Sequence, residues 1–428
     1  MLRFSRIGSM VFIFSFLVRQ AAWAQAPQAQ APPTLQDLQR KVEVLAEEVE
    51  KLRSGEPEQE VTRERATSLG LGLSAASVYR KTRGVSIAGY GEMLYENFAG
   101  NDQGGAARNQ GTTVDFVRAV VYFGYRFNDK FLFNSEIEIE HANEIFLEFA
   151  HIDYVAHPGF TARGGLILLP MGLTNEFHEP AAFMSAKRSE TESRIIPSTW
   201  RENGFGLVGS SGKFSYRAYL VNGLNAAGFA ADGIRNGRQK GSRARVDDAA
   251  FVGRADVTPI PGTLFGGSYY FGNSSQDQFA VAGQSIGVRT KIAEGHGQVQ
   301  MRGFDVRGLY ARAHLADVAR LNAARSLIGT AGVAEVMEGG YFQGGYNLLA
   351  QLSDRGSLMP FYRFEHINTQ AKVAPGFTAN PANDRKIHTV GFQFLPISNV
   401  SVKSDYQWIR NEANTGLNQF NISLGYNF

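Results

Sequence analysis

The chain has 428 residues, with 43 basic and 40 acidic side chains, 47 glycines and no cysteine. Without cysteine it cannot use disulfides, which are common in oxidising compartments. A formal net charge of +3 at pH 7 gives no indication of a nucleic-acid partner. The many glycines and an aromatic content of 12% are more typical of a membrane β-barrel than of a helical membrane protein.

Residues 1–24 have the pattern of an export signal. Two arginines precede an apolar run over residues 7–18, and the small residues around Trp23 predict cleavage after Ala24. The run is too short to cross a bilayer as a helix, and no later segment approaches twenty apolar residues. Removal of this signal peptide with its three arginines leaves 40 basic and 40 acidic side chains, so we expect an exported protein without net charge.

Three segments of different composition follow the export signal. Residues 25–33 are rich in Ala, Gln and Pro, and they predict a flexible tether. Residues 34–53 have apolar side chains spaced 3, 4, 3, 4 and 3, which predicts a periplasmic coiled coil; they are Leu35, Leu38, Val42, Leu45, Val49 and Leu52. The alternative is a single amphipathic helix on its own domain. So short a coil is marginal alone and would need an oligomer held together elsewhere. Residues 54–83 are expected to be a linker.

The last eleven residues, 418–428, alternate strictly between apolar and polar side chains. One face of this predicted strand carries Phe420, Ile422, Leu424, Tyr426 and Phe428. A lipid-facing strand needs this alternation, because only a closed barrel satisfies every strand backbone group within hydrocarbon. The terminal Phe428, with Tyr426 two residues before it, is similar to the signal that the barrel-assembly machinery recognises. A soluble antiparallel strand is the alternative for these residues alone.

From Gly84 onward the hydrophobicity has a period of two residues, which predicts strands. Sixteen runs can be counted, over 84–99, 113–128, 130–141, 145–157, 160–171, 200–210, 213–225, 246–258, 262–273, 284–293, 297–315, 337–352, 357–370, 386–395, 400–411 and 418–428.

The connections between these runs alternate between short turns and long polar loops. The short turns are at 128–129, 158–159, 210–212, 259–262, 294–297, 353–356 and 396–399. The other connections are around 100–112, 142–144, 172–199, 226–245, 274–283, 316–336, 371–385 and 412–417. This asymmetry predicts an all-β fold, a transmembrane antiparallel β-barrel of about 16 strands over residues 84–428, with both termini in the periplasm.

The inward face of the predicted barrel is charged. In the run 130–141, Glu136, Glu138 and Glu140 alternate with apolar residues, and each carboxylate would be costly if it faced lipid. This pattern predicts a water-filled lumen. Further lumen candidates of mixed sign are Arg118, Arg126, Arg217, Arg254, Arg307, Arg363 and Lys403, and Asp256, Asp305, Glu365 and Asp405.

The loop 172–199 is the longest connection, and we expect it to fold into the lumen and narrow the channel. Its candidate constriction residues, with one residue just after it, are Lys187, Arg188, Glu190, Glu192, Arg194 and Arg201. The loop region also carries Glu176, Glu179 and Glu202, so its balance of charge does not by itself indicate an anion filter.

Two short motifs have ordinary explanations. The sequence GFGLVG at 204–209 matches the dinucleotide-binding GxGxxG pattern, but no helix pattern follows it, and small residues at crowded strand positions explain it. His178 lies between two glutamates without a second histidine at helical spacing, so a metal site is not expected there. No cofactor, metal or catalytic set is predicted, although a barrel lipase could distribute its catalytic residues over several strands.

Several stretches resemble one family. They are Leu147 to Tyr154 leading to the LPMG sequence at 169–172, then 252–259, 360–365 and 390–396. Together with the signal peptide, the coil and the sixteen strands, they make residues 34–428 resemble the phosphate-selective porin O/P family. This resemblance implies a trimer and a third extracellular loop that constricts the pore. In phosphate-specific members it also implies a ladder of arginines with lysines at the constriction.

We therefore expect a homotrimeric outer-membrane porin for passive diffusion of small hydrophilic solutes, with a lean toward anions or phosphate that the resemblance implies. Peptidoglycan is a candidate partner of the coiled coil. Two alternatives remain open: a lipase-type barrel enzyme of the outer membrane, and a structural barrel that sheathes or anchors a partner protein.

Overall fold

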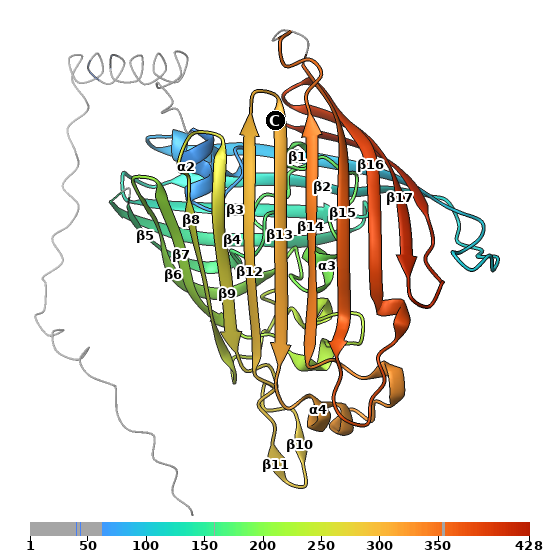
Figure 1. Cartoon of the computed structure of the whole chain (residues 1–428). Helices are drawn as coiled ribbons and strands as arrows, with labels where there is room; N and C mark the ends of the chain where they lie inside the picture. Colours follow the sequence, from blue (N-terminus) through green and yellow to red (C-terminus); the bar gives the residue numbers. More distant parts are fainter. Residues whose placement is uncertain (1–39, 41–42, 44–61, 158, 353–355) are drawn as a thin grey trace, which may run out of the picture. The chain divides into compact units, whose positions relative to one another are not determined.

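The computed structural model describes Arg40, Glu43 and residues 62–157, 159–352 and 356–428. The chain divides into two units, Met1–Glu56 and Pro57–Phe428, and Figure 1 shows the second as a barrel. The predicted signal peptide and tether lie outside the described residues, as does nearly all of the predicted coil, so these three assignments stay predictions.

Sixteen antiparallel strands form a closed barrel in which β1 pairs with both β2 and β18, which confirms the predicted fold class. The strands are β1 (Gly84–Phe98), β2 (Thr113–Arg126), β3 (Phe131–Glu140), β4 (Glu144–His157), β5 (Phe160–Leu168), β6 (Arg201–Ser211), β7 (Phe214–Asn222), β8 (Ala249–Val257), β9 (Thr263–Gly272), β12 (Thr290–Met301), β13 (Phe304–Leu315), β14 (Val336–Tyr346), β15 (Ser357–Lys372), β16 (Asp384–Ile397), β17 (Val400–Asn411) and β18 (Gln419–Asn427). A separate hairpin, β10 (Ala280–Val281) with β11 (Gln284–Ser285), lies between β9 and β12.

The prediction was wrong at one turn. It placed a turn at 294–297, whereas β12 runs through these residues and the turn lies at Arg302-Gly303. The outward positions of β12 in this stretch are alanine and glycine, so the strand lacks the apolar alternation that marks the others. Its inward positions are Glu294 and His296, whose side chains pair at 2.9 Å.

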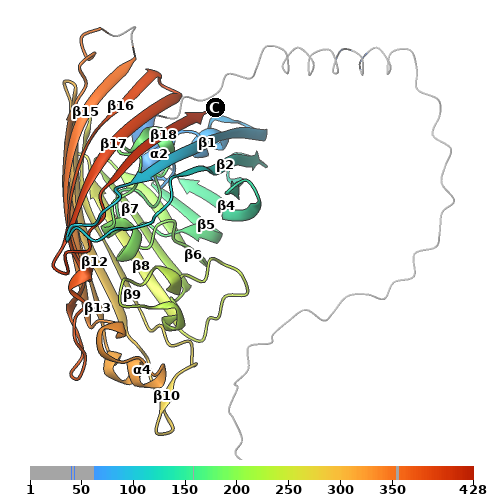
Figure 2. The ribbon, with the colours of Figure 1, turned by 90° about the vertical axis from the view of Figure 1, so that its right-hand side faces the viewer.

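Most short turns lie at one end of the barrel and most long loops at the other. The exceptions are the brief connection 141–143 at the long-loop end and the longer connection 347–356 at the turn end. Seven connections of the turn type join β2 to β3, β4 to β5, β6 to β7, β8 to β9, β12 to β13, β14 to β15 and β16 to β17. The C-terminus lies at this turn end, where the Phe428 amide donates to the Gly89 carbonyl at 2.9 Å. Figure 2 shows α4 (Val318–Ala324) and β10 at the opposite end. None of the helices among the described residues is long and apolar enough to cross a membrane.

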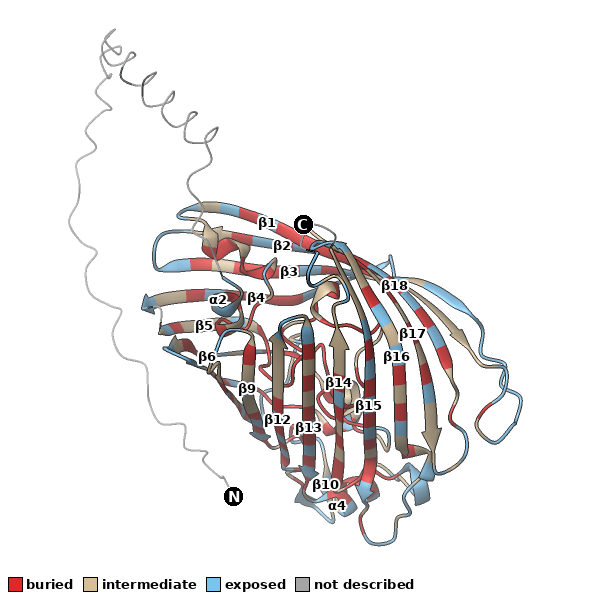
Figure 3. Cartoon of the chain, turned by 45° about the horizontal axis from the view of Figure 1, so that its top comes forward, coloured by how far each residue is buried: buried red, intermediate tan, exposed pale blue. Residues whose placement is uncertain are grey.

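The barrel exposes apolar side chains and encloses polar ones. Figure 3 shows how buried and exposed residues alternate along its strands. On β2, Val121 and Phe123 are exposed, whereas Arg118 and Tyr122 are buried. On β18, the predicted apolar face at 420–428 is exposed and the alternate asparagine and serine side chains are buried. This arrangement is the reverse of a soluble sandwich, in which the apolar face of each strand is covered.

Residues 62–83 do not form the linker that the sequence suggests. They form α2 (Arg63–Ser68) and the 3-10 helix η1 (Ala75–Arg80), and both lie against the inner wall of the barrel near its turn end. The Thr62 hydroxyl accepts from the Arg65 amide at 3.2 Å and caps α2. The leucines of this stretch alternate with glycines over only five residues, so it shows neither a helical period nor a full strand. Most of its apolar side chains are buried because the barrel surrounds them. We call residues 62–83 the lumen segment.

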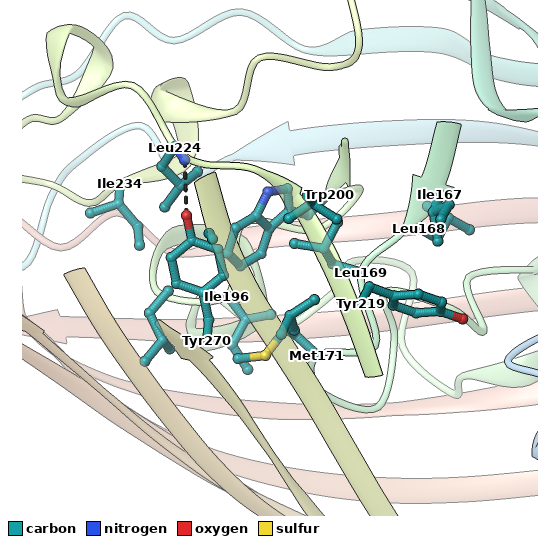
Figure 4. Close-up of a cluster of buried hydrophobic side chains, with 14 of the residues drawn as sticks. Ile167, Leu168, Leu169, Met171, Ile196, Trp200, Tyr219, Leu224, Ile234 and Tyr270 are labelled. Atoms are coloured by element: carbon teal, nitrogen blue, oxygen red, sulfur yellow. Dashed lines mark hydrogen bonds between the residues drawn. The ribbon is translucent and has the colours of Figure 1, made fainter. Parts of the chain in front are cut away.

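Part of the lumen is filled by an apolar core rather than by water. Figure 4 shows side chains of the loop 169–200 and of the loop 223–248 packed against the wall. The rings of Trp200 and Tyr270 lie 4.9 Å apart between centroids, and the Tyr270 hydroxyl accepts from the Leu224 amide at 2.9 Å. Burial of each such large side chain contributes roughly 1.5–3 kcal/mol, so the core fixes both loops in the barrel.

Candidate functional site

The loop 169–200, called L3 below, connects β5 to β6 and lies inside the barrel. It contains the short helical turns η2 (Pro180–Ala182) and α3 (Thr191–Arg194), and most of its residues are buried. Asn175 Nδ2 donates to the carbonyls of Leu169 and Trp200, at 2.7 and 3.0 Å, which draws the two ends of the loop together. The inward-folded loop that the sequence suggested is therefore present, close to the predicted bounds 172–199.

Wall cations bind the backbone carbonyls of L3. Arg307 Nη1 on β13 donates to Ala182 at 3.1 Å, and Arg254 on β8 donates to Gly172. Arg363 Nη1 on β15 donates to the Lys187 carbonyl at 3.3 Å. These three arginines were predicted as lumen residues, and the structure uses them as anchors for the loop.

Wall carboxylates bind the amides of the same loop. Glu365 on β15 accepts from the amides of Glu190 and Thr191, at 3.1 and 2.6 Å. Asp405 on β17 accepts from the Ala186 amide at 2.6 Å. Charged side chains of β8, β13, β15 and β17 therefore bind the backbone of L3, which is held from several sides of the barrel.

Glu192 is buried inside L3 and does not line an open passage. Its Oε1 accepts from the amides of Leu173 and Thr174, at 2.6 and 2.8 Å, and its Oε2 accepts from the Tyr341 hydroxyl at 2.8 Å. This candidate constriction residue closes the loop on itself and ties it to β14.

Three other candidates of L3 are paired. Glu190, the residue before α3, pairs with Arg194 and with Arg385 Nη1, the latter at 3.1 Å. Burial alone would raise the pKa of Glu190, but Arg194, Arg385 and Lys187 together outweigh burial and hold this pKa below its ordinary value. Lys187 Nζ lies 2.7 Å from Glu96 Oε1 on β1. These pairs fix the part of L3 that faces β1, β15 and β16.

The predicted wall residue Arg217 is fully enclosed. Its Nη2 donates to Asp256 Oδ2 at 2.6 Å, its Nε lies 3.3 Å from Glu176 Oε1, and its Nη1 donates to the Thr67 carbonyl of the lumen segment at 2.7 Å. It therefore joins the wall, L3 and the lumen segment at one point.

Two predicted lumen residues lie toward the ends of the barrel. Arg126 donates to the turn carbonyls of Asn128 and Asp129, at 3.2 and 3.0 Å, and to the Tyr79 carbonyl at 3.4 Å. Glu140 is the last residue of β3 and is half-buried at the long-loop end.

Glu136 and Glu138 face inward as predicted, but their side chains are buried and are not exposed to solvent in an open lumen. Glu136 Oε1 accepts from the Tyr90 hydroxyl at 3.1 Å and lies 3.3 Å from His178 Nε2. Glu138 lies 3.3 Å from Arg118 Nη1. Burial and the nearby Arg188 lower the pKa of His178 to about 3, so this histidine is neutral. Among the described residues, no group of three or more His, Asp or Glu side chains could hold a metal ion.

Five arginines gather where L3 meets the loop 223–248, which we call L4. This basic cluster consists of Arg118 on β2, Arg188 on L3, Arg201 on β6, and Arg235 and Arg238 on L4. Arg201 is paired with Glu148, and Arg238 Nη1 donates to the Thr199 carbonyl of L3 at 2.7 Å. The buried Nη2 of Arg188 has no hydrogen-bond partner among the described residues.

Burial and the positive charges of neighbouring members lower the pKa of each loop arginine in the cluster. Burial lowers the pKa of Arg188, and the charge of Arg118 lowers it further. Burial followed by the charges of Arg238 and Arg188 lowers the pKa of Arg235 to about 9. Burial also lowers the pKa of Arg238 to about 10, with Arg201 adding to the effect. These shifts are those of partly desolvated cations whose local carboxylates do not fully compensate them.

Sequence reasoning missed the two L4 members of the basic cluster. The predicted loop 226–245 contains five basic residues and a single acidic one, which is a readable signal. Only the folding of L3 and L4 against each other brings Arg235 and Arg238 to the side of Arg188.

Comparisons with solved structures agree with the fold. The chain is similar to Salmonella typhi OmpF in complex with daunomycin, with a TM-score of 0.53 and 12% identity over 81% of this chain and 98% of that one. It is also similar to a loop L8 deletion mutant of OmpT, an outer membrane protein of Vibrio cholerae, with a TM-score of 0.52 and 11% identity over 81% and 100%. The resemblance to phosphate-selective porins is thereby confirmed only at the level of an outer-membrane porin fold.

No family model matches the chain. An uncharacterized protein of Aquifex aeolicus (strain VF5) is 36% identical over 353 residues, which cover 79% of this chain and 78% of that protein. Identity at this level over most of both chains shows common descent, and the chain belongs to the family of this Aquifex aeolicus protein.

Proposed function

We propose that the protein is an outer-membrane channel for passive diffusion of small hydrophilic solutes. The single observation that carries this proposal is L3, a long loop held inside a closed barrel whose outer face is apolar. An apolar outer face suits a barrel that spans a membrane, and a loop anchored inside leaves a passage narrower than the wall itself.

The constriction proposed here lies between L3, L4 and the wall of β2 to β6, at the basic cluster. Arg118 and Arg201 are compensated there by Glu138 and Glu148. Arg188, Arg235 and Arg238 have no ion pair with a carboxylate among the described residues, which leaves an excess of positive charge. A surplus of fixed cations at the narrowest point attracts anions and repels cations, so we propose a modest preference for anions, phosphate included.

The assembly proposed is a homotrimer in the outer membrane of a Gram-negative cell, made after cleavage of the signal peptide at Ala24. The predicted coil at 34–53 would clasp the trimer in the periplasm or contact peptidoglycan. The exposed aromatic side chains at the end of β18, Tyr426 and Phe428, support recognition by the barrel-assembly machinery.

The test is the reversal potential of the purified protein in a planar bilayer under a KCl gradient, followed by addition of phosphate. The full proposal is supported if the reversal potential lies toward the equilibrium potential of chloride and if phosphate reduces the current. A current without ion preference supports the channel and overturns the anion preference. Absence of any current in repeated insertions overturns the channel, and lipid-ester hydrolysis or a co-purifying partner would then identify a barrel enzyme or a sheath.

A further inference from the structure

The lumen segment is bound by polar side chains of the barrel wall. Arg163 Nη1 on β5 donates to the Leu69 carbonyl at 3.0 Å, and Asn134 Nδ2 on β3 donates to the Ala75 carbonyl at 2.8 Å. Arg217 on β7 binds the Thr67 carbonyl, as described above. Three different strands therefore supply donors to a segment that lies 59 to 150 residues away in sequence.

Apolar burial holds the same segment in place. Leu69, Ala76 and Val78 are almost fully buried, and the ring of Tyr79 is covered. The Tyr79 hydroxyl donates to Asp153, whose carboxylate also receives Arg163 Nε and Nη2 at 2.8 and 2.9 Å. Every barrel strand already has two strand neighbours, so the segment adds no strand and occupies lumen volume instead.

The lumen segment also touches L3, through two glutamates that face two glycines. A Cβ built on Gly70, where φ is +69°, would lie 2.1 Å from Glu176 Oε1, and one on Gly72 would lie 2.2 Å from Glu179 Oε1. A larger residue at either position would displace the facing carboxylate, and the positive φ of Gly70 further favours glycine there. Glu179 Oε2 further accepts from the Ser74 hydroxyl at 3.3 Å. The position of L3 at these two glutamates therefore depends on the lumen segment.

We propose that the lumen segment is a plug that narrows the channel from its turn end and holds L3 in place. This inference rests on the proposed channel function. Both elements line one open pocket of about 830 Å³ at the turn end, to which Ser68 and Gly72 of the plug and Leu173 and Glu179 of L3 contribute. This pocket is the space that the plug leaves free, so displacement of the plug widens the passage and loosens the constriction loop.

The plug is tested in the full chain by the substitution Tyr79→Ala, which removes the ring and the hydroxyl while Arg163 still pairs with Asp153. The chain has no cysteine, so Ser68→Cys on α2 supplies a single thiol whose site is 8% exposed when the plug is seated. We expect slow labelling of Ser68→Cys alone and fast labelling in the Tyr79→Ala background. We also expect a single-channel conductance about twofold higher or more, because displacement of the plug widens the turn end and loosens L3, which forms the proposed constriction.

An engineered disulfide provides the rescue. The hydroxyl oxygens of Ser77 on the plug and Ser86 on β1 lie 2.7 Å apart, so Ser77→Cys with Ser86→Cys can pin the plug to the wall. In the Tyr79→Ala background the oxidised pair is expected to restore the original conductance, and reduction is expected to release it again. Tyr216→Ala is the matched control, because the Tyr216 hydroxyl binds the Gly159 carbonyl of a turn, away from the plug.

The outcomes separate the plug from the channel. Current from the unmodified protein, with fast labelling but unchanged conductance in Tyr79→Ala, overturns the plug and leaves the channel function intact. Slow labelling in Tyr79→Ala means that the plug is still seated, and the stronger variant Leu69→Asp is then used. Fast labelling with unchanged conductance in Leu69→Asp overturns the plug as well. Absence of current from the unmodified protein overturns the proposed function itself. Raised conductance that oxidation of the cysteine pair reverses supports the plug.

Discussion

The hydroxyl of Tyr341 on β14 donates a 2.8 Å hydrogen bond to the Glu192 carboxylate of L3. The same carboxylate accepts two amides from the beginning of L3, so the wall, the end of the loop and its beginning meet at one side chain. A residue that sequence reasoning assigned to the passage therefore sets the shape of the loop that forms it.

Loss of this carboxylate is expected to loosen L3. In Glu192→Ala, the buried amides of Leu173 and Thr174 lose their acceptor, at a cost of about 1–3 kcal/mol for each unsatisfied donor. We expect a lower thermal midpoint in detergent and larger current fluctuations in single-channel records. Tyr341→Phe removes only one of the three hydrogen bonds, so a larger effect from Tyr341→Phe than from Glu192→Ala would contradict this role.

Arg188 combines a buried nitrogen that has no hydrogen-bond partner with the lack of an ion pair among the described residues, so we expect it to contribute most to ion preference. Arg188→Gln removes one charge from the basic cluster without adding a carboxylate, and the reversal potential should move toward the cation side. Arg245→Gln is the matched control, since Arg245 on L4 is exposed and lies 3.0 Å from Asp247. Equal shifts from the two variants would show that overall charge, rather than this cluster, determines the preference.

The contact between L3 and the plug should weaken as the pH rises. Burial raises the pKa of Glu179 from about 4.5 to about 7, although hydrogen bonds from Ala75 and Ser74 oppose this. The folded state therefore holds a proton that the unfolded state releases, and its stability falls as the pH rises from about 4.5, up to a loss of ~3 kcal/mol above pH 7.

The pH effect is measured by the labelling rate of Ser68→Cys between pH 5 and pH 8, corrected for thiol ionisation with a cysteine on an exposed loop. Labelling should become faster toward pH 8. Glu179→Gln stays neutral throughout and should flatten the corrected profile. An unchanged slope in this variant would assign the dependence to other groups.

The apolar core inside the barrel should matter more than an equivalent side chain on its outside. Trp200 is fully buried, and Trp200→Ala is expected to cost about 3–5 kcal/mol and to release L3. Trp408 on β17 is 39% exposed and faces outward, so Trp408→Ala should lower the thermal midpoint less. Comparable midpoints for both variants in detergent would show that the core in Figure 4 does not stabilise the fold.

Phe428 should matter for assembly more than for stability. Its side chain is 61% exposed, whereas its amide binds Gly89 through the backbone. Phe428→Ala is therefore expected to reduce the amount of folded protein in the outer membrane severalfold, while the purified protein unfolds at nearly the original temperature. Phe420→Ala, on the same outward face of β18, is the control; equal losses from both variants would argue against a terminal signal.

The barrel could be predicted in detail because its evidence is local. The side chains of a membrane strand alternate between lipid and lumen, so the apolar face at 420–428 and the charged face of β3 are visible in sequence as a period of two. The prediction was wrong where this alternation is absent, in the glycine-rich part of β12. The end that carries the turns could also be predicted locally, because the length of each connection follows from where its two flanking strands end.

The sequence by itself determined a sixteen-stranded barrel with its long loops at one end, and it identified L3 as the loop that enters the barrel. The tertiary structure decided which charged side chains are paired with other groups of the protein and which are left without an ion pair. Arg254 and Arg307 bind carbonyls of a distant loop besides their wall carboxylates. The basic cluster brings Arg188 near residues of L4, and the apparent linker at 62–83 fills part of the turn end. None of these contacts repeats along the chain with a fixed period, because each arises only when the closed barrel forces separate segments into one enclosed volume.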